Sequence, residues 1–111
     1  MGVVLPFPAR GTGGQIGFSR FELNRIVDLY GRMVAAGLWR DYAIAFEPGA
    51  AAFWAFRRTA ERPEYRIEKR PGARQGGWAL IGEGGEVIRR GRELGSVLAP
   101  IERRLLKLVA G

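Results

Sequence analysis

Residues 41–58 read DYAIAFEPGAAAFWAFRR, and this stretch decides the fold class. Over residues 41–46, large side chains alternate with alanines, which is the two-residue period of a β-strand. The segment 47–49, Glu-Pro-Gly, is a turn signal, and residues 52–58 follow as a second strand. In this second strand, Phe53 and Ala55 would face one side of the sheet and Trp54 and Phe56 the other.

Further turn signals extend the strand pattern downstream. We expect strands over residues 65–70, 78–81 and 86–90, and the last two flank Gly82-Glu83-Gly84-Gly85, the strongest hairpin signal in the chain. Turns that recur roughly every 8–12 residues without helices between them indicate an antiparallel meander.

Segments with helical periodicity flank the strands. Ser19-Arg20-Phe21-Glu22 is a capping box, and it begins a helix that Gly37 is suited to end. Apolar residues recur at helical spacing over residues 93–109, but Pro100 is unfavourable inside a helix, so we expect a short helical turn before it and the main helix to begin near it. The predicted fold class is α+β, a twisted, mostly antiparallel sheet of four to five strands packed by an N-terminal and a C-terminal helix.

The expected organisation is a flexible tail over residues 1–17 and a single α+β domain over residues 18–111. Prolines and glycines interrupt the tail, although Val3-Val4-Leu5 would suit an edge strand. The glycine-rich residues 11–17 lack the Walker lysine and the spacing of a nucleotide-binding loop. We interpret them as part of the tail.

The chain has no cysteine and no histidine, which removes most catalytic and metal chemistry. Without them there is no disulfide, no thiolate ligand and no imidazole base. Glu61, Glu64 and Glu68 cluster, but neighbouring arginines favour ion pairs over an acid–base pair. We therefore predict a non-catalytic protein with no catalytic, metal-binding or cofactor-binding residues.

The sequence shows no membrane or export signal. No apolar run approaches the roughly 18 residues that a bilayer-spanning helix needs, and the start lacks the basic region of a signal peptide. We expect a cytoplasmic protein without a membrane partner.

Positive charge is the clearest functional signal. The net charge is +7, and arginine supplies sixteen of the eighteen basic residues, with ten of the eighteen between positions 57 and 92. The planar guanidinium suits phosphate, carboxylate and aromatic faces. A GC-rich coding sequence is the competing explanation, because it would enrich arginine, glycine and alanine without any function for arginine.

Arginines interleave with aromatic residues in the expected strands, so alternate positions would form a basic sheet face. Such a face would contact RNA or DNA phosphates, while an exposed Trp or Phe stacks on unpaired bases. The opposing hypothesis is that the aromatics form the core and the arginines a solvated outer surface. The candidate polyanion-binding residues are Arg57, Arg58, Arg66, Arg70, Arg74, Arg89, Arg90 and Arg92.

A protein partner is the alternative hypothesis. Exposed aromatics and a free strand edge, with arginines beside them, would suit an adaptor for an acidic protein or a homodimer. A deep pocket with a perturbed carboxylate would instead indicate an enzyme.

Several motifs carry a family resemblance. They include Phe21-Glu22-Leu23, residues 30–35 (YGRMVA), residues 39–44 (WRDYAI), residues 65–71 (YRIEKRP) and Gln75-Gly76, together with Phe56-Arg57-Arg58. This pattern resembles a small bacterial family of single-domain proteins classed only as a domain of unknown function. The resemblance covers roughly residues 18–108. It implies a stand-alone bacterial cytoplasmic protein and carries over no activity.

Overall fold

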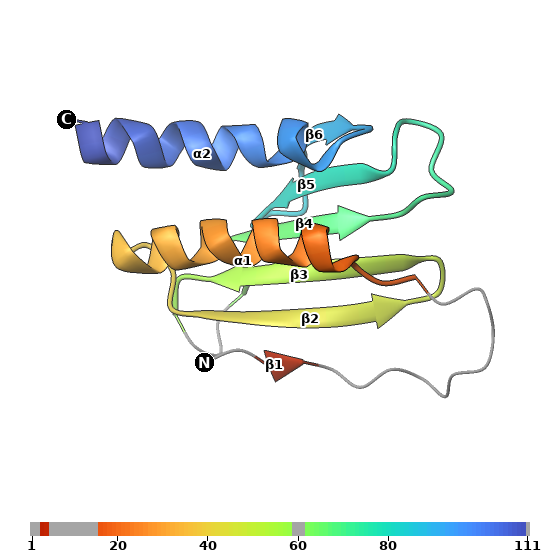
Figure 1. Ribbon diagram of the computed structural model, residues 1–111, viewed down its shortest axis with the longest axis horizontal. Coiled ribbons are helices and arrows are strands. Elements are labelled where there is room, and N and C mark those ends of the chain that lie inside the picture. Colours follow the sequence, from red (N-terminus) through yellow and green to blue (C-terminus); the bar gives the residue numbers. More distant parts are fainter. Residues whose placement is uncertain (1–2, 5–15, 59–61, 111) are drawn as a thin grey trace.

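The computed structural model describes residues 3–4, 16–58 and 62–110, which form one mixed sheet and two helices (Figure 1). Most of the predicted tail, residues 1–2 and 5–15, lies outside the described residues. The elements in chain order are β1 (Val3–Val4), α1 (Arg20–Ala35), β2 (Asp41–Glu47), β3 (Ala50–Phe56), β4 (Tyr65–Lys69), β5 (Trp78–Gly82), β6 (Val87–Gly91) and α2 (Leu94–Ala110).

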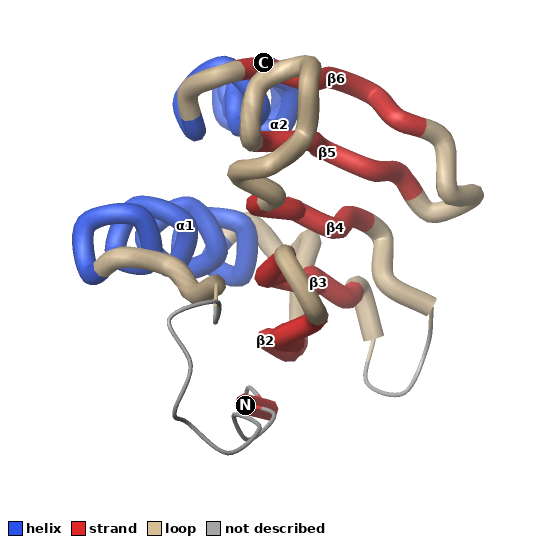
Figure 2. The backbone as a smooth tube through the Cα atoms, turned by 90° about the vertical axis from the view of Figure 1, so that its right-hand side faces the viewer, coloured by secondary structure: helices blue, strands red, loops and turns tan. Residues whose placement is uncertain are grey.

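The strands follow one another through the sheet in the order β1 to β6. Strands β2 to β6 form the predicted antiparallel meander, and β1 adds a parallel edge strand against Ala43 and Ile44 of β2. Both helices lie on the same face of this sheet, as Figure 2 shows. The predicted α+β fold, with an N-terminal and a C-terminal helix packed on an antiparallel sheet, is confirmed.

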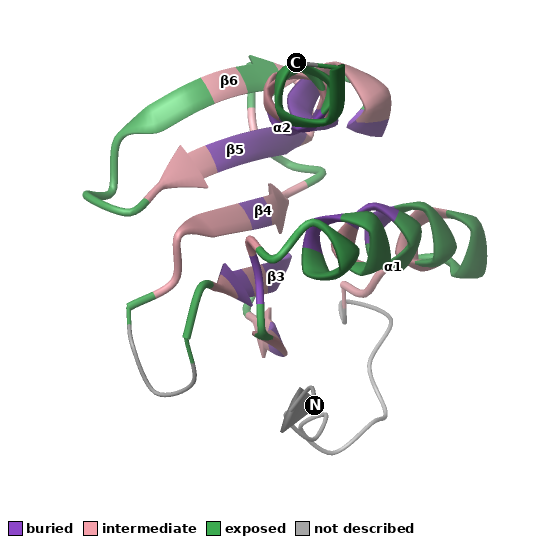
Figure 3. Ribbon diagram, turned by 90° about the vertical axis from the view of Figure 1, so that its left-hand side faces the viewer, coloured by how far each residue is buried: buried purple, intermediate pink, exposed green. Residues whose placement is uncertain are grey.

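The core lies between the helices and the sheet, where Figure 3 shows the buried segments. A row of apolar side chains crosses the helix-facing side of the sheet, because Ile44 pairs with Phe53, Phe53 with Ile67, and Ile67 with Leu80. The helices cover this row with fully buried apolar side chains. These are Ile26, Leu29 and Met33 from α1, and Val97, Leu98 and Ile101 from α2.

The predicted capping box begins α1. Ser19 Oγ accepts a hydrogen bond from the Glu22 backbone N–H (3.1 Å), and the Glu22 carboxylate accepts one from the Ser19 N–H (2.7 Å). Lys69 Nζ of β4 also donates to this carboxylate (2.7 Å). The start of α1 is thereby attached to the sheet.

The prediction for the C-terminal helix is wrong at Pro100. Helix α2 is continuous from Leu94 to Ala110 and includes this proline. Proline has no N–H to donate to the carbonyl four residues earlier, which belongs to Ser96. The Arg89 guanidinium of β6 donates to that carbonyl instead (3.3 Å), so a side chain from the sheet replaces the missing helical hydrogen bond.

The second strand of the first hairpin begins two residues earlier than predicted. Glu47 pairs with Ala50, so Pro48 and Gly49 alone form the turn, and Gly49 has a φ of 75° that favours glycine. Neither helix in the described part of the chain is long and apolar enough to span a membrane.

Candidate polyanion-binding surface

The eight candidate arginines fall in different parts of the molecule. Four of them lie at the end of the sheet where β4 and β6 finish, two follow β3 at the opposite end, one lies on the open sheet face and one on the helix-facing side. The four at the end of β4 and β6 are Arg70, Arg74, Arg90 and Arg92. The two that follow β3 are Arg57 and Arg58. Arg66 lies on the open sheet face, and Arg89 lies on the helix-facing side. We call the first four residues the basic end.

The basic end forms because the β4–β5 turn packs against the end of β6 (Figure 1). The Arg70 N–H donates to the Gly77 carbonyl (2.7 Å), and the Gly77 N–H donates to the Gly91 carbonyl (3.1 Å). Gly76 has a φ of 95°, and a Cβ there would collide with the Gly91 carbonyl and approach Arg92 N to 2.9 Å. Only glycine fits this contact, which brings the turn and its arginine to the end of β6.

Three arginines of the basic end are available for a ligand. Arg74, Arg90 and Arg92 are exposed, and their side chains make no ion pair or hydrogen bond with any other described residue. The acidic side chains at this end are Glu93, which is also exposed, and Glu68, which is paired with Arg70. Positive charge therefore exceeds negative charge at this end of the sheet.

A small polar pocket of about 220 Å³ lies within the basic end. Arg70 and Arg90 line it together with Gln75, Glu68 and the Gly77 backbone. Two guanidinium groups and an amide supply donors for the oxygens of one phosphate group. Glu68 is the acidic member of the lining, and it is already bound to arginines.

On the open face of the sheet, charges are paired with one another. Arg66 of β4 extends across β3 and forms an ion pair with Glu47 of β2 (3.0 Å). Arg66 also pairs with Glu68 (2.9 Å), and Arg70 pairs with the same Glu68 carboxylate (3.3 Å). Burial would raise the pKa of Glu68, but hydrogen bonds from Arg66 and Arg70 outweigh it and hold this pKa below its ordinary value. Because both carboxylates compensate the arginines, Arg66 has a structural role.

Arg66 also covers the half-buried Trp54. Its guanidinium carbon lies 5.9 Å from the centre of the Trp54 ring, a cation–π distance. The Trp54 Nε1 is buried and has no hydrogen-bond partner among the described residues. An indole covered in this way does not offer a free face for stacking on a base.

The remaining candidate arginines lie away from the basic end. Arg57 contacts Glu83 of the β5–β6 turn at 2.7 Å, and Arg58 follows it on the exposed surface at that end of the sheet. Arg89 binds the Ser96 carbonyl, as described above. The structure therefore divides the predicted set instead of gathering it on one face.

Most large aromatic side chains pack inside the protein. Trp39, Phe53 and Trp78 are buried, and Tyr42 stacks on Phe53 with ring centroids 5.1 Å apart. Among the described residues, the one exposed large aromatic is Phe21, which is 76% exposed. An aromatic interface on the sheet, for bases or for a second copy, is therefore not supported by the packing.

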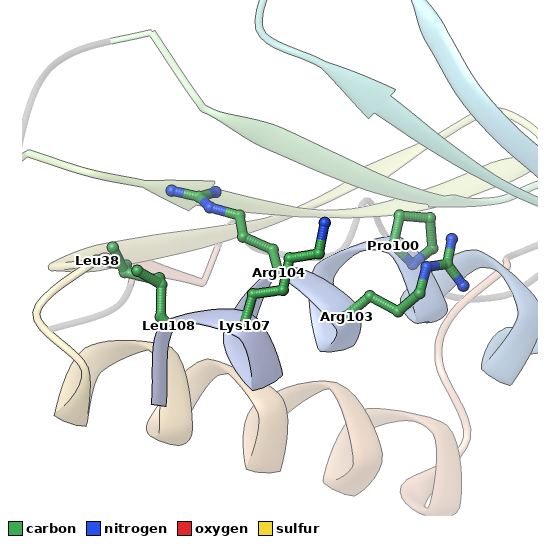
Figure 4. A pocket seen from close by; sticks show the side chains of 6 residues that line it. All are labelled: Leu38, Pro100, Arg103, Arg104, Lys107 and Leu108. Atoms are coloured by element: carbon green, nitrogen blue, oxygen red, sulfur yellow. The ribbon is translucent and has the colours of Figure 1, made fainter. Parts of the chain in front are cut away.

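A second group of cations was missed at the sequence level. Arg103, Arg104 and Lys107 of α2 line a groove with Leu38, Pro100 and Leu108 (Figure 4). Their spacing on the predicted C-terminal helix places them close together, but the predicted set included only basic residues between positions 57 and 92. Among the described residues, no group of three or more acidic side chains is arranged to hold a metal ion.

The fold and its charges define an α+β domain with a basic end and a cationic groove on its C-terminal helix. The chain belongs to the family described as "Protein of unknown function (DUF2794)", whose profile matches residues 16–98. The predicted family resemblance is thereby confirmed. No curated protein matches the chain, and no solved structure matches it.

Proposed function

We propose that this protein is a non-catalytic binding module whose basic end contacts the phosphate backbone of RNA or DNA. One observation carries the proposal: Arg74, Arg90 and Arg92 are exposed at the same end of the sheet, without an ion-pair partner among the described residues, beside the small polar pocket that Arg70 lines. In a bacterial cytoplasm, the location predicted from the sequence, RNA and DNA are the abundant polyanions.

The arrangement favours an extended anion over an isolated small one. The three exposed cations come from the β4–β5 turn, from β6 and from the segment that leads into α2, so a chain of phosphates would contact them in succession. Phosphate contacts position a nucleic acid without reading its sequence. We expect binding that tolerates many sequences and weakens strongly with salt, because each neutralised phosphate releases counterions.

The test compares two triple variants by fluorescence anisotropy with labelled single-stranded RNA and duplex DNA. The first, Arg74→Ala/Arg90→Ala/Arg92→Ala, removes the exposed cations of the basic end. The control, Arg40→Ala/Arg62→Ala/Arg103→Ala, removes three exposed arginines elsewhere. Each lowers the net charge from +7 to +4, so any difference between them reports position and not total charge.

At near-physiological salt, we expect the basic-end variant to lose at least about tenfold in affinity, since each phosphate contact is a charge-assisted hydrogen bond. The control variant is expected to change affinity much less. Equal losses in both variants would show non-specific attraction to a basic protein, and the proposed function would be rejected.

A further inference from the structure

The groove along the C-terminal half of α2 combines apolar walls with cations. Its volume is about 570 Å³, and three apolar side chains, Leu38, Pro100 and Leu108, line it with three basic ones. Figure 4 shows Leu38 and Leu108 at one end, with the Arg104 guanidinium on their side, and Pro100 with the Arg103 guanidinium at the other end; the Lys107 ammonium lies between them. The groove thus has its two leucines at one end, while Arg103 and Lys107 lie away from that end.

One cation of the groove, Arg104, is already paired with a carboxylate of the protein. Arg104 Nη1 donates to Glu64 Oε2 (3.0 Å) and to the Tyr65 hydroxyl (3.3 Å). The other oxygen of the Glu64 carboxylate accepts a hydrogen bond from Trp39 Nε1 (2.9 Å), and Trp39 is itself buried. These contacts fix Arg104 in place, so its long side chain forms a preorganised wall of the groove.

The other two cations have no counter-charge within the part of the chain that the structure describes. Arg103 and Lys107 are exposed, lie one helical turn apart, and make no ion pair or side-chain hydrogen bond with any residue in the described ranges. Their charges are therefore available to an anionic group that enters the groove.

The groove on the other side of α2 provides a contrast. It has nearly the same volume, about 540 Å³, and its lining includes Leu105, Leu106 and Val109. Its two charged residues, Arg32 and Glu102, lie 3.8 Å apart and compensate each other. Uncompensated positive charge thus distinguishes the groove of Arg103 and Lys107.

We propose that the groove of Arg103 and Lys107 binds an amphipathic anion, a small molecule with an aliphatic body and one carboxylate or phosphate head. The aliphatic body would contact Leu38 and Leu108, and the head would accept hydrogen bonds from Arg103 and Lys107. The volume lies within the roughly 300–1,000 Å³ of small-molecule sites, which are mostly apolar with a few convergent polar groups. This site is separate from the basic end, and its ligand does not depend on nucleic-acid binding.

The first experiment is a two-dimensional amide NMR titration of the full chain with decanoate and with decyl phosphate, both as monomers at millimolar concentration. Decanol, which has the same aliphatic body without charge, is the matched ligand control. We expect saturable shifts at Leu38 and over residues 103–108 with the anions and much weaker shifts with decanol. Comparison of the two anions shows whether the head is a carboxylate or a phosphate.

Two protein variants complete the test. Arg103→Gln/Lys107→Gln removes both unpaired cations at exposed positions, and we expect it to weaken decanoate binding by at least about tenfold. Arg74→Gln/Arg90→Gln removes the same charge at the basic end, and decanoate affinity is expected to stay within about twofold of wild type.

Three results would overturn the proposal. The first is the absence of saturable shifts in the groove with either anion. The second is equal affinity for decanol, or unchanged affinity in Arg103→Gln/Lys107→Gln, since either would show apolar contact without anion recognition. The third is binding to vesicles of anionic phospholipid without binding to monomeric decanoate or decyl phosphate, which would make this surface a membrane contact.

Discussion

Three glycines allow the packing of the β4–β5 turn to be tested by graded substitution to alanine. Gly76 has a positive φ, and its added Cβ would collide with the end of β6. Gly85 has a similar φ of 88°, but apart from its chain neighbours no described residue lies within 4 Å of its added Cβ. Gly72, in the same turn as Gly76, has no positive φ, and apart from its chain neighbours no residue of the described ranges lies within 4 Å of its added Cβ. The series therefore separates backbone strain from steric overlap.

The expected free-energy changes follow from these environments. Gly72→Ala is expected to change stability little or to increase it by up to about 1 kcal/mol, because alanine restricts the unfolded chain. Gly85→Ala is expected to cost about 1–2 kcal/mol for its left-handed backbone. Gly76→Ala adds to this cost an overlap with backbone atoms, which is worth about 1–3 kcal/mol, so we expect a total loss of about 2–5 kcal/mol.

Urea unfolding followed by tryptophan fluorescence measures these differences, since Trp39 and Trp78 are buried in the folded state. The same variants link the turn to the basic end, because movement of residue 76 away from Gly91 would separate Arg74 from Arg92. We expect Gly76→Ala to lose RNA affinity, with Gly85→Ala unaffected. A Gly76→Ala variant no less stable than Gly85→Ala would refute the reasoning.

Two further predictions concern contacts within the fold. Arg89→Ala is expected to lower the free energy of unfolding by about 1–3 kcal/mol, because the Ser96 carbonyl loses its donor. In a Pro100→Ala background the loss is expected to be at least about 1 kcal/mol smaller, because residue 100 regains a helical N–H. A double-mutant cycle by urea unfolding measures this coupling, and additive effects would contradict it. The pKa of Glu68 is held below its ordinary value in the folded protein. The ionised carboxylate therefore contributes its full stabilisation at pH values above its pKa in the unfolded chain, which is about 4.3. This stabilisation is lost as the pH falls through the pKa in the folded protein. We therefore expect Glu68→Gln to be less stable than wild type at neutral pH and the difference to close in acid; a difference independent of pH would exclude this role for the carboxylate.

The fold was predictable where the determining contacts are close in sequence. The alternation in β2 and the Ser19–Glu22 box each depend on neighbours within a few residues, and both were predicted correctly. The continuity of α2 was not predictable in this way. It depends on Arg89, a side chain of the preceding strand, which supplies the hydrogen bond that Pro100 cannot make.

The sequence identified the candidate arginines but not which of them lie together or remain exposed. Which arginines act together depends on strand register, since the Trp78–Gly91 pair brings the end of β6 beside the β4–β5 turn. Which arginines are neutralised depends on Glu47, a residue two strands away from Arg66. Neither relation is visible as a local pattern, so the sequence-level set contained structural arginines together with exposed ones.

The salt dependence of RNA binding tests the central claim most directly. For single strands, the slope of log K against log salt concentration is about −0.7 per neutralised phosphate. If Arg74, Arg90 and Arg92 each contact one phosphate, the slope of Arg74→Ala/Arg90→Ala/Arg92→Ala is expected to be shallower than that of wild type by about 2. The equally charged control Arg40→Ala/Arg62→Ala/Arg103→Ala is expected to keep the wild-type slope. Parallel slopes for wild type and the basic-end variant would contradict the assignment of the basic end as the nucleic-acid contact.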